Sequence, residues 1–287
     1  MYKYSIVILN YLNYYDTIEC MDSIFKMGYK YEGIVIVDNN SSNESFKVLN
    51  SKYKFNKNVI VVKTRKNYGF AKGNNIGISL ARRKFHTDFV MVINNDVLFK
   101  EKDYFSKLLN HYTYGIGMIG SEIHIKKDEV QEEILYDILL KGTFKFLFNM
   151  YLEKNGKDIW SFLVPPVKEK KMVKVLHGSA ILFTPDFFKY YKGFYDRTFL
   201  YSEEPILYLM CKKYGLRQMY VTDTYIYHKE DRSSELSFQN NLDAVNNYLR
   251  QSYKFLVWWI IKDKFNGIIK QLIGISNNDI IYESMMG

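Results

Sequence analysis

The sequence predicts an α/β protein built on a doubly wound, mostly parallel sheet, and three observations predict it. Short β-branched runs alternate with longer segments of helical pattern through the first hundred residues. A polar cluster follows each of those runs, as expected where a ligand binds beyond the carboxyl ends of parallel strands. At 287 residues, with 47% hydrophobic and 25% charged residues, the chain can bury a large core.

Four strands and three helices are predicted in the first half. The apolar runs are nearly continuous, which is typical of parallel strands buried on both faces. The predicted strands are Tyr4–Leu9, Gly33–Val37, Val59–Lys63 and Phe89–Asn94, and the predicted helices are Tyr14–Phe25, Ser42–Tyr53 and Ala71–Arg83. Ser41 or Ser42 is the predicted N-cap of the second helix, because a serine oxygen can accept from the free backbone N–H groups of a first turn.

The second half is less regular. Strands are predicted over Ile116–Ile125 and Lys174–Phe183, a helix over Pro205–Tyr214 that ends at Gly215, and helical structure from Leu236 onward. Residues 126–171 contain Lys-rich stretches and Pro165-Pro166, so we expect an insertion or flexible loop there.

Charge narrows the class of partner. A formal net charge of +9 suits an anionic partner, such as nucleic acid, anionic lipid or a diphosphate-bearing substrate. Nucleic acid is not expected, because the chain has no zinc-finger, RRM or arginine-rich signature. Cys20 and Cys211 lie far apart without metal-ligand spacing and are predicted to be reduced core residues of a cytosolic protein.

Membrane insertion is not expected either. The N-terminal residues enter a predicted strand directly, so we expect no signal peptide. The longest uncharged apolar run near the C-terminus, Phe255–Ile261, is far shorter than the roughly 20 residues needed to span a bilayer.

Two polar segments are candidates for nucleotide binding. The first predicted strand is followed by Asn10-Tyr11-Leu12-Asn13, which has no glycine, so NAD and FAD are not expected. Asp38 ends the second strand and is placed to accept hydrogen bonds from a base or ribose. Acidic residues at strand ends are also common turn formers.

A glycine-rich segment follows the third strand. Gly69 would let the backbone approach a ligand closely, and Lys72 could meet phosphate charge. The same pattern is equally typical of a helix N-terminus with small packing residues, and the residues alone leave both interpretations open.

Two candidate metal ligands stand at predicted strand ends. Asp96 closes the segment Asn94-Asn95-Asp96, and a carboxylate there could share a divalent cation with substrate phosphates. His228 follows a strand-like YIY, where its imidazole could ligate metal or bind diphosphate. Taken singly, the first segment also reads as a polar turn and the second as a structural histidine.

Two acidic residues are candidates for proton transfer. Glu203 and Glu204 come just before Pro205, which starts helices well. The dipole of a helix favours an ionised carboxylate at its N-terminus, and a general base must be ionised. An ordinary capping acid is the alternative.

Taken in order, these segments resemble one family. SIVILNY, IVIVDNNSS, NYGFAKGNNIGI and FVMVINNDV are similar to the nucleotide-sugar half of family 2 glycosyltransferases. LHGSAILF, GFYDRTFLYSEEPIL and YHKED are similar to the acceptor half. The resemblance runs from Ser5 to Asp231, and the most similar subgroup is the rhamnosyltransferase-like enzymes of bacterial surface polysaccharide assembly.

The resemblance implies a fold and a division of the chain. It implies the GT-A fold, with a mostly parallel doubly wound sheet, a smaller mixed sheet on the acceptor side and C-terminal helices. Residues 1–235 would form the catalytic domain, with a nucleotide-sugar half over about 1–100 and an acceptor half over about 101–235. Residues 236–287 would form a C-terminal helical segment.

It also implies an inverting reaction with named participants. The donor would be a dTDP-, UDP- or GDP-linked sugar, and the acceptor a hydroxyl of a glycan or lipid-linked oligosaccharide. The implied donor-binding residues are Asn10, Tyr11, Asp38, Asn67, Gly69, Lys72, Asn95, Gly178 and Ser179. Asp96 and His228 would bind Mn²⁺ or Mg²⁺, although Asn94 stands where the family has its first aspartate. Glu204 would be the catalytic base, with Glu203 as the fallback, because Glu-Glu replaces the usual Glu-Asp.

Two other functions and one surface are weighed beside this one. A nucleotidyltransferase would carry a glycine-rich basic loop after the first strand, which is missing here. A catalytically silent carbohydrate- or membrane-binding module is the alternative from another class. Residues 250–270 combine aromatic and basic side chains, which predicts either a helix on the inner face of the cytoplasmic membrane or a last helix packed on the core.

Overall fold

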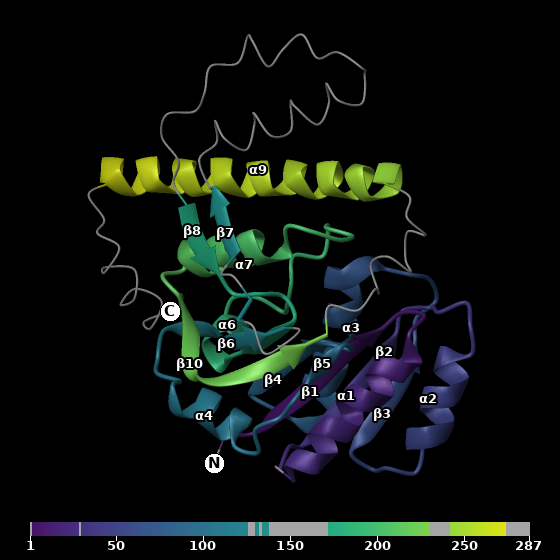
Figure 1. Cartoon of the computed structure of the whole chain (residues 1–287). Coiled ribbons are helices and arrows are strands. Elements are labelled where there is room, and N and C mark those ends of the chain that lie inside the picture. Colours follow the sequence, from purple (N-terminus) through teal and green to yellow (C-terminus); the bar gives the residue numbers. More distant parts are fainter. Residues whose placement is uncertain are drawn as a thin grey trace.

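A single eight-stranded sheet forms the centre of the protein (Figure 1). The structure is a computed structural model and describes residues 2–28, 30–125, 130–131, 134–137, 172–229 and 242–273. The central strands are β1 (Tyr4–Asn10), β2 (Gly33–Asp38), β3 (Val59–Lys63), β4 (Phe89–Asn94), β5 (Val97–Leu98), β6 (Ile116–His124), β9 (Ala180–Phe183) and β10 (Arg217–His228). The helices are α1 (Tyr14–Met27), α2 (Ser45–Tyr53), α3 (Gly69–Phe85), α4 (Tyr104–Asn110), α6 (Pro185–Phe188), α7 (Glu203–Lys213) and α9 (Leu242–Ile273).

The first four strands form the regular part of the sheet. They pair in the order β3-β2-β1-β4, all parallel, with α1 and α2 on one face and α3 on the other. Alternate residues of β1 serve the two faces: Ile6 and Ile8 pack towards α1, and Val7 packs towards α3. Burial on both faces is the reason that β1, β2 and β4 have continuous apolar runs, whereas the edge strand β3 is only partly buried.

The sheet continues into the second half with mixed strand directions. β9 is antiparallel to both β4 and β6, β10 is parallel to β6, and β5 is antiparallel to β10. A register shift between Val221 and Tyr225 bends β10, and its last residue, His228, then lies opposite Val97 of β5. The predicted α/β class and mixed acceptor side are confirmed, whereas the domain boundaries stay predictions.

The second helix begins later than predicted, and the predicted serine cap is wrong. α2 starts at Ser45, and its N-cap, Glu44, makes no side-chain capping bond. The Ser41 hydroxyl instead accepts from Leu12 N–H at 2.8 Å, and Ser41 N–H donates to Asp38 Oδ1 at 3.0 Å. Ser41 therefore lies in a turn after β2 and not at a helix N-terminus. The Asp38 side chain holds that turn by accepting from Ser41 N–H, and such side-chain bonds to the backbone compete with helix formation.

The predicted strand Lys174–Phe183 is in fact two strands in different sheets. β8 (Met172–Val175) pairs with β7 (Ile134–Asp137) in a small antiparallel sheet, and β9 joins the central sheet after a break at residues 176–179. β7 lies within the segment 126–171, where a loop or insertion was expected; apart from residues 130–131 and 134–137, that segment lies outside the described residues.

The long C-terminal helix packs on the second half (Figure 1). Leu256, Trp259 and Ile260 of α9 are buried in the same core as α7, so packing on the core is confirmed for this face. Trp258 and Phe265 remain exposed. Among the described helices, none has a stretch that is both long and apolar enough to cross a membrane.

Candidate active site

Four segments meet near the carboxyl end of β4. Asn94–Asp96 follow β4, 177–179 precede β9, Glu203 and Glu204 begin α7, and 228–229 end β10. Strand pairing brings them together: Asn94 N–H donates to the Ser179 carbonyl at 2.8 Å, and β5 carries the chain from Asp96 along the end of β10.

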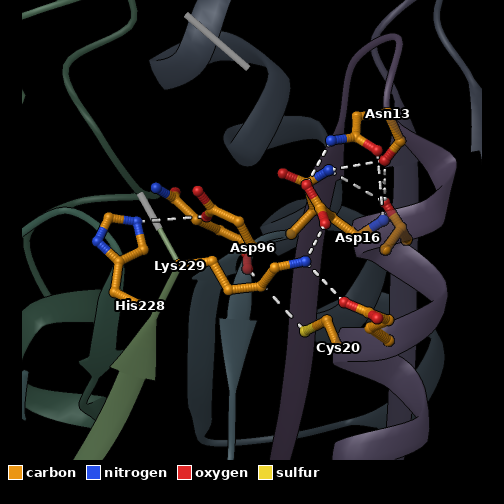
Figure 2. Close-up of polar contacts among 10 residues, drawn as sticks. Asn13, Asp16, Cys20, Asp96, His228 and Lys229 are labelled. Atoms are coloured by element: carbon orange, nitrogen blue, oxygen red, sulfur yellow. Dashed lines mark hydrogen bonds and ion pairs between the residues drawn. The ribbon is translucent and has the colours of Figure 1, made fainter. Parts of the chain in front are cut away.

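Asp96 and His228 form a buried pair. Their side chains face each other in Figure 2, with His228 Nε2 3.3 Å from Asp96 Oδ1, and both residues are less than a tenth exposed. This contact lacks the geometry of a hydrogen bond, and among the described residues neither Asp96 Oδ1 nor His228 Nδ1 makes one. Buried polar atoms are nearly always hydrogen-bonded in folded proteins, so one such atom on each of two neighbouring side chains indicates a place for a ligand.

Lys229 ties this pair to α1. Its backbone N–H donates to the Asp96 carbonyl at 3.1 Å, and its ammonium group contacts Asp16 and lies 2.6 Å from Glu19 Oε2 (Figure 2). Burial lowers the pKa of Lys229, but the two acidic partners outweigh burial and leave that pKa raised. Lys229 is therefore a fixed cation that holds the end of β10 against α1.

His177 is a site residue that was not predicted. Its ring lies edge-on to that of His228, with centroids 5.5 Å apart, and its Nδ1 accepts from Ser179 N–H at 3.0 Å. Burial, with a smaller contribution from His228, lowers the pKa of His177 to about 4, so its imidazole is neutral at pH 7. The segment LHGSAILF contains the signal, since His177 directly precedes the predicted Gly178 and Ser179.

The two glutamates at the start of α7 have different surroundings. Glu203 is buried and its carboxyl hydrogen-bonds with the Thr198 hydroxyl and the Tyr201 backbone. Glu204 is only half-buried, and its carboxylate accepts from Gly178 N–H. An added Cβ at Gly178 would lie 2.7 Å from Glu204 Oε1, so only glycine permits this approach.

Burial overrides the helix dipole at both carboxyl groups. Burial and the neighbouring Glu204 raise the pKa of Glu203 to about 8, and burial also raises the pKa of Glu204. Two adjacent carboxylates resist double ionisation, and the raised pKa of Glu203 favours its protonated form near pH 7. The partly exposed Glu204 is then the carboxylate available to accept a proton.

The turn before these glutamates is strained. Tyr201 and Ser202 both have left-handed backbone conformations, with φ of 76° and 65°. Residues with a Cβ rarely adopt this region, and each such residue costs about 1–3 kcal/mol unless its surroundings hold it there. Strain of this kind concentrates at functional sites, although it does not by itself prove one.

Two predicted donor-binding residues form a closed network. Asn10 Nδ2 donates to Asp38 Oδ2 at 2.8 Å, Asn10 Oδ1 accepts from Thr17 at 2.8 Å, and Ser41 N–H donates to Asp38 Oδ1. Asn10 and Asp38 are fully buried. Their side chains shape the ends of β1 and β2, and Tyr11, the residue after Asn10, is half-buried.

Asn95 points towards α1. Its side-chain amide donates to the Asn13 carbonyl at 2.9 Å and lies 3.3 Å from Thr17 Oγ1. Asn95 therefore joins the closed network around Thr17, while its neighbour Asp96 faces His228.

The glycine-rich segment is held by a second residue that was not predicted. Asn39 Nδ2 donates to Asn67 Oδ1 at 2.9 Å and to the Gly69 carbonyl at 3.1 Å. Gly69 has a φ of 77°, and an added Cβ would lie 2.2 Å from the Phe199 carbonyl oxygen. The glycine is thus required for packing between the two halves. Lys72 is exposed, with its ammonium 5.2 Å from the centre of the Tyr68 ring.

The residues present fit a divalent cation that is shared with substrate. Among the described residues, no cluster of three or more His, Cys, Asp or Glu side chains could hold a metal by itself. Asp96 and His228 supply one carboxylate and one imidazole, each with a buried atom that lacks a hydrogen bond. Catalytic Mg²⁺ is often held by one or two protein carboxylates together with substrate phosphates, and imidazole suits transition metals.

Comparisons with known proteins identify a family and a fold. A sequence profile described as Glycosyl transferase family 2 matches residues 5–166. The crystal structure of GalNAc-T7 with UDP, GalNAc and Mn2+ superposes with a TM-score of 0.59 at 13% identity, covering 81% of this chain and 45% of that one. A comparison with curated proteins found no match.

Two microbial structures are also similar. TarS 1-349 from S. aureus, in complex with UDP-GlcNAc, has a TM-score of 0.53 at 14% identity and covers 82% of this chain and 60% of that one. The mannosyltransferase PcManGT from Pyrobaculum calidifontis, in complex with GDP-Man and Mn2+, has a TM-score of 0.55 at 11% identity and covers 94% and 75%. This chain therefore spans less than two thirds of the GalNAc-T7 and TarS chains, and at these identities the likeness shows the shared GT-A fold.

Proposed function

The chain belongs to glycosyl transferase family 2, and from that premise we propose that it is an inverting glycosyltransferase that uses a nucleoside-diphosphate-sugar donor. The observation that carries the proposal is the buried Asp96–His228 pair near the carboxyl end of β4, in which each residue has one buried polar atom without a hydrogen bond among the described residues. Ligands of open α/β sheets bind at that edge. The similar structures with UDP, UDP-GlcNAc or GDP-Man support a nucleotide-sugar donor.

Glu204 is the proposed general base. Its carboxylate takes a proton from an acceptor hydroxyl, and the hydroxyl oxygen attacks the anomeric carbon from the face opposite the diphosphate. One displacement inverts the anomeric centre without a covalent enzyme intermediate. Burial raises the pKa of Glu204, and a raised pKa makes a carboxylate a stronger proton acceptor.

Asp96 and His228 are the proposed ligands of a divalent cation, Mn²⁺ or Mg²⁺. The cation would supply positive charge to the departing nucleoside diphosphate. His177 stays neutral beside His228 and so adds no positive charge that would compete for the same diphosphate. The GalNAc-T7 and PcManGT structures with Mn2+ support the choice of cation.

The donor can be identified without knowing the acceptor. We propose screening UDP-, dTDP- and GDP-linked sugars with Mn²⁺, first by thermal shift and then by release of nucleoside diphosphate, with water in place of the acceptor. A bound donor stabilises the folded state by RT ln(1 + [L]/Kd), so a cognate donor raises Tm only when the cation is present. Failure of every donor in both assays would reject the transferase proposal in favour of a silent binding module.

We further propose that the acceptor is a growing, lipid-linked surface glycan, as in the rhamnosyltransferase-like subgroup, and that α9 binds the inner membrane surface from the cytoplasm. The outward face of α9 carries Lys254, Trp258 and Phe265, of which Trp258 is 46% and Phe265 62% exposed. The ammonium of Lys262 lies 4.6 Å from the centre of the Trp258 ring. Exposed aromatic residues beside lysines suit a headgroup layer of anionic lipids.

Flotation with anionic liposomes tests this surface. The double variant Trp258→Ser/Phe265→Ser should lose binding, because it removes both exposed aromatic side chains and leaves the buried face of α9 intact. Phe55→Ser is the matched control, since Phe55 is 86% exposed but lies after α2, away from α9. Equal flotation of the double variant and the wild type would reject the membrane proposal and leave the donor assays unaffected.

A further inference from the structure

Residues 199–202 form the turn just before α7 and Glu204, and segments distant in the sequence hydrogen-bond to this turn from two sides. On one side, Phe70 N–H at the start of α3 donates to the Phe199 carbonyl at 2.7 Å. On the other, Ser252 of α9 donates to the Leu200 carbonyl at 2.7 Å. The two carbonyls belong to adjacent residues, so these bonds fix the path of the chain just before it enters the left-handed turn.

Aromatic stacking is a second contact between α9 and this turn. The Phe199 ring stacks on Tyr248 with centroids 4.4 Å apart and 16° between planes. Ser252, one helical turn further along α9, is 1% exposed, so its hydroxyl bond is shielded from water. One face of α9 therefore touches two consecutive residues of the turn.

The contacts on the other side of the turn come from the start of α3, in the predicted nucleotide-sugar half. Gly69 packs directly on the Phe199 carbonyl, and its own carbonyl accepts from Asn39, which also holds Asn67. Asn39 is next to Asp38 of the closed network. A continuous set of contacts thus joins the predicted donor-binding segment to the turn before the base.

The backbone strain at Tyr201 and Ser202 explains why the turn needs contacts from both sides. Tyr201 and Ser202 both occupy the left-handed region, and such conformations persist only where the surroundings over-determine them. Glu203 contributes from within, because its carboxyl hydrogen-bonds with Thr198 and the Tyr201 backbone. If the turn relaxed, α7 would start differently and the Glu204 carboxylate would leave Gly178 N–H.

We propose that α9 is a positioning element of the reaction: Tyr248 and Ser252, opposed by Gly69 of α3, hold residues 199–202 in their left-handed turn and so place Glu204 beside Gly178. The proposal rests on the assignment of Glu204 as the base. It makes α9 part of the catalytic unit, in addition to any role at a membrane.

Kinetics of donor hydrolysis test the proposal in the full-length protein. Using the donor with the fastest nucleoside diphosphate release, Ser252→Ala should lower kcat about ten-fold and Tyr248→Ala about as much, because small misplacements of a reacting group cost up to about a hundred-fold. The KM for the donor should stay unchanged. Ser252→Thr keeps the hydroxyl and should restore most of the rate.

Ile260→Val is the matched control. It removes one buried methyl group from the same helix, away from the turn, and should lower Tm by about the same 2–4 °C as Ser252→Ala. Its kcat should equal that of the wild type. Equal kcat losses in Ile260→Val and Ser252→Ala would show that α9 acts only through stability and would overturn the proposal.

Hydrogen exchange provides a test that needs no donor. Backbone amides of residues 198–206 should exchange faster in Ser252→Ala and Tyr248→Ala than in Ile260→Val, because only the first two variants release the turn. Unchanged exchange in all three would overturn the positioning proposal. If exchange rises as expected but Glu204→Gln retains full activity, the positioning role stands and the assignment of the base fails.

Discussion

The two halves of the site treat their buried polar groups in opposite ways. Around Thr17, the side chains of Asn10, Asp38 and Asn95 are joined in a closed network, either by direct hydrogen bonds or through Thr17. Between the ends of β4 and β10, Asp96 and His228 lie together, and each has a buried atom that makes no hydrogen bond among the described residues; Glu203 Oε1, at the start of α7, is a third such atom. The first arrangement stabilises a fold, and the second leaves capacity for a ligand or a proton.

This difference predicts which variants should lose stability and which should lose activity. A residue whose hydrogen bonds are all made within the protein contributes first to stability, because its removal leaves buried partners unsatisfied. A residue with unused capacity contributes little to the folded state alone and is needed when substrate binds. Variants on the two sides should therefore separate into those that lose stability and those that lose activity.

The largest expected effect is at Glu204. Glu204→Gln keeps the shape of the side chain but cannot accept the proton, so turnover should fall by about 10²–10⁴-fold. Donor affinity, measured by thermal shift, should barely change. If Glu203→Gln is inactive while Glu204→Gln retains its rate, the roles of the two glutamates are reversed.

The next effect is at Asp96. Asp96→Ala removes the one carboxylate of the candidate metal site and should lower Mn²⁺- or Mg²⁺-dependent turnover by about 10²–10³-fold, the range seen when one transition-state contact is lost. Circular dichroism and Tm should remain close to the wild type, since Asp96 Oδ1 makes no hydrogen bond among the described residues. Metal-dependent turnover at the wild-type rate would reject the assignment.

Glu203 should show its effect in the pH dependence of stability. Its pKa is raised from 4.5 to about 8 in the folded state, so between these values the folded protein binds more protons than the unfolded chain. Stability from this group is complete below about pH 4.5 and is lost as pH rises towards 8. Glu203→Gln lacks this titration and should gain a few kcal/mol relative to the wild type at pH 8 compared with pH 5.

Denaturant unfolding at the two pH values measures that gain. Glu44→Gln is the control, because Glu44 is an exposed acid at the start of α2. A gain for Glu203→Gln that is the same at pH 5 and pH 8 would contradict the protonated state of Glu203.

The smallest expected effect is in the closed network around Thr17. Asn10→Ala deprives the buried Asp38 carboxylate and the Thr17 hydroxyl of a partner, and should lower the free energy of unfolding by about 1–3 kcal/mol. His228→Ala is the matched variant from the other side and should cost less stability but more activity. Urea unfolding and turnover are measured for both variants. A larger loss of stability in His228→Ala than in Asn10→Ala, with a larger loss of turnover in Asn10→Ala, would contradict this contrast.

The first half of the fold is predictable because each of its strands has a clear apolar pattern of its own in the sequence. β3 and β4 coincide with the predicted strands, and the predicted β1 and β2 are each one residue short of the observed ones. β1, β2 and β4 are buried on both faces, so their apolar runs are uninterrupted, and the edge strand β3 keeps an apolar run although it is only partly buried. The start of α2 was missed because the Asp38 side chain captures Ser41 N–H, which a pattern of hydrophobic residues does not reveal.

The second half is less predictable because its elements depend on distant partners. The segment Lys174–Phe183 is uniformly strand-like in sequence, yet its two parts pair with β7 and with β4 and β6. Likewise, the sequence predicts Asp96, His228 and Glu204 as separate candidates, and only the pairing of β5 with β10 and β4 with β9 brings their segments together. Tyr248 and Ser252 carry no local signal of their contact with the turn before α7.

The pairing of β5 with β10 has a consequence for how the protein comes into being on the ribosome. The β1–β4 region can fold from neighbouring segments as they emerge, but Val97 and Leu98 must wait for Tyr227 and His228. Contacts between segments so far apart in sequence form late. The candidate metal pair is consequently completed only when most of the chain has been synthesised, so a nascent chain can form the β1–β4 region well before it can complete the candidate site.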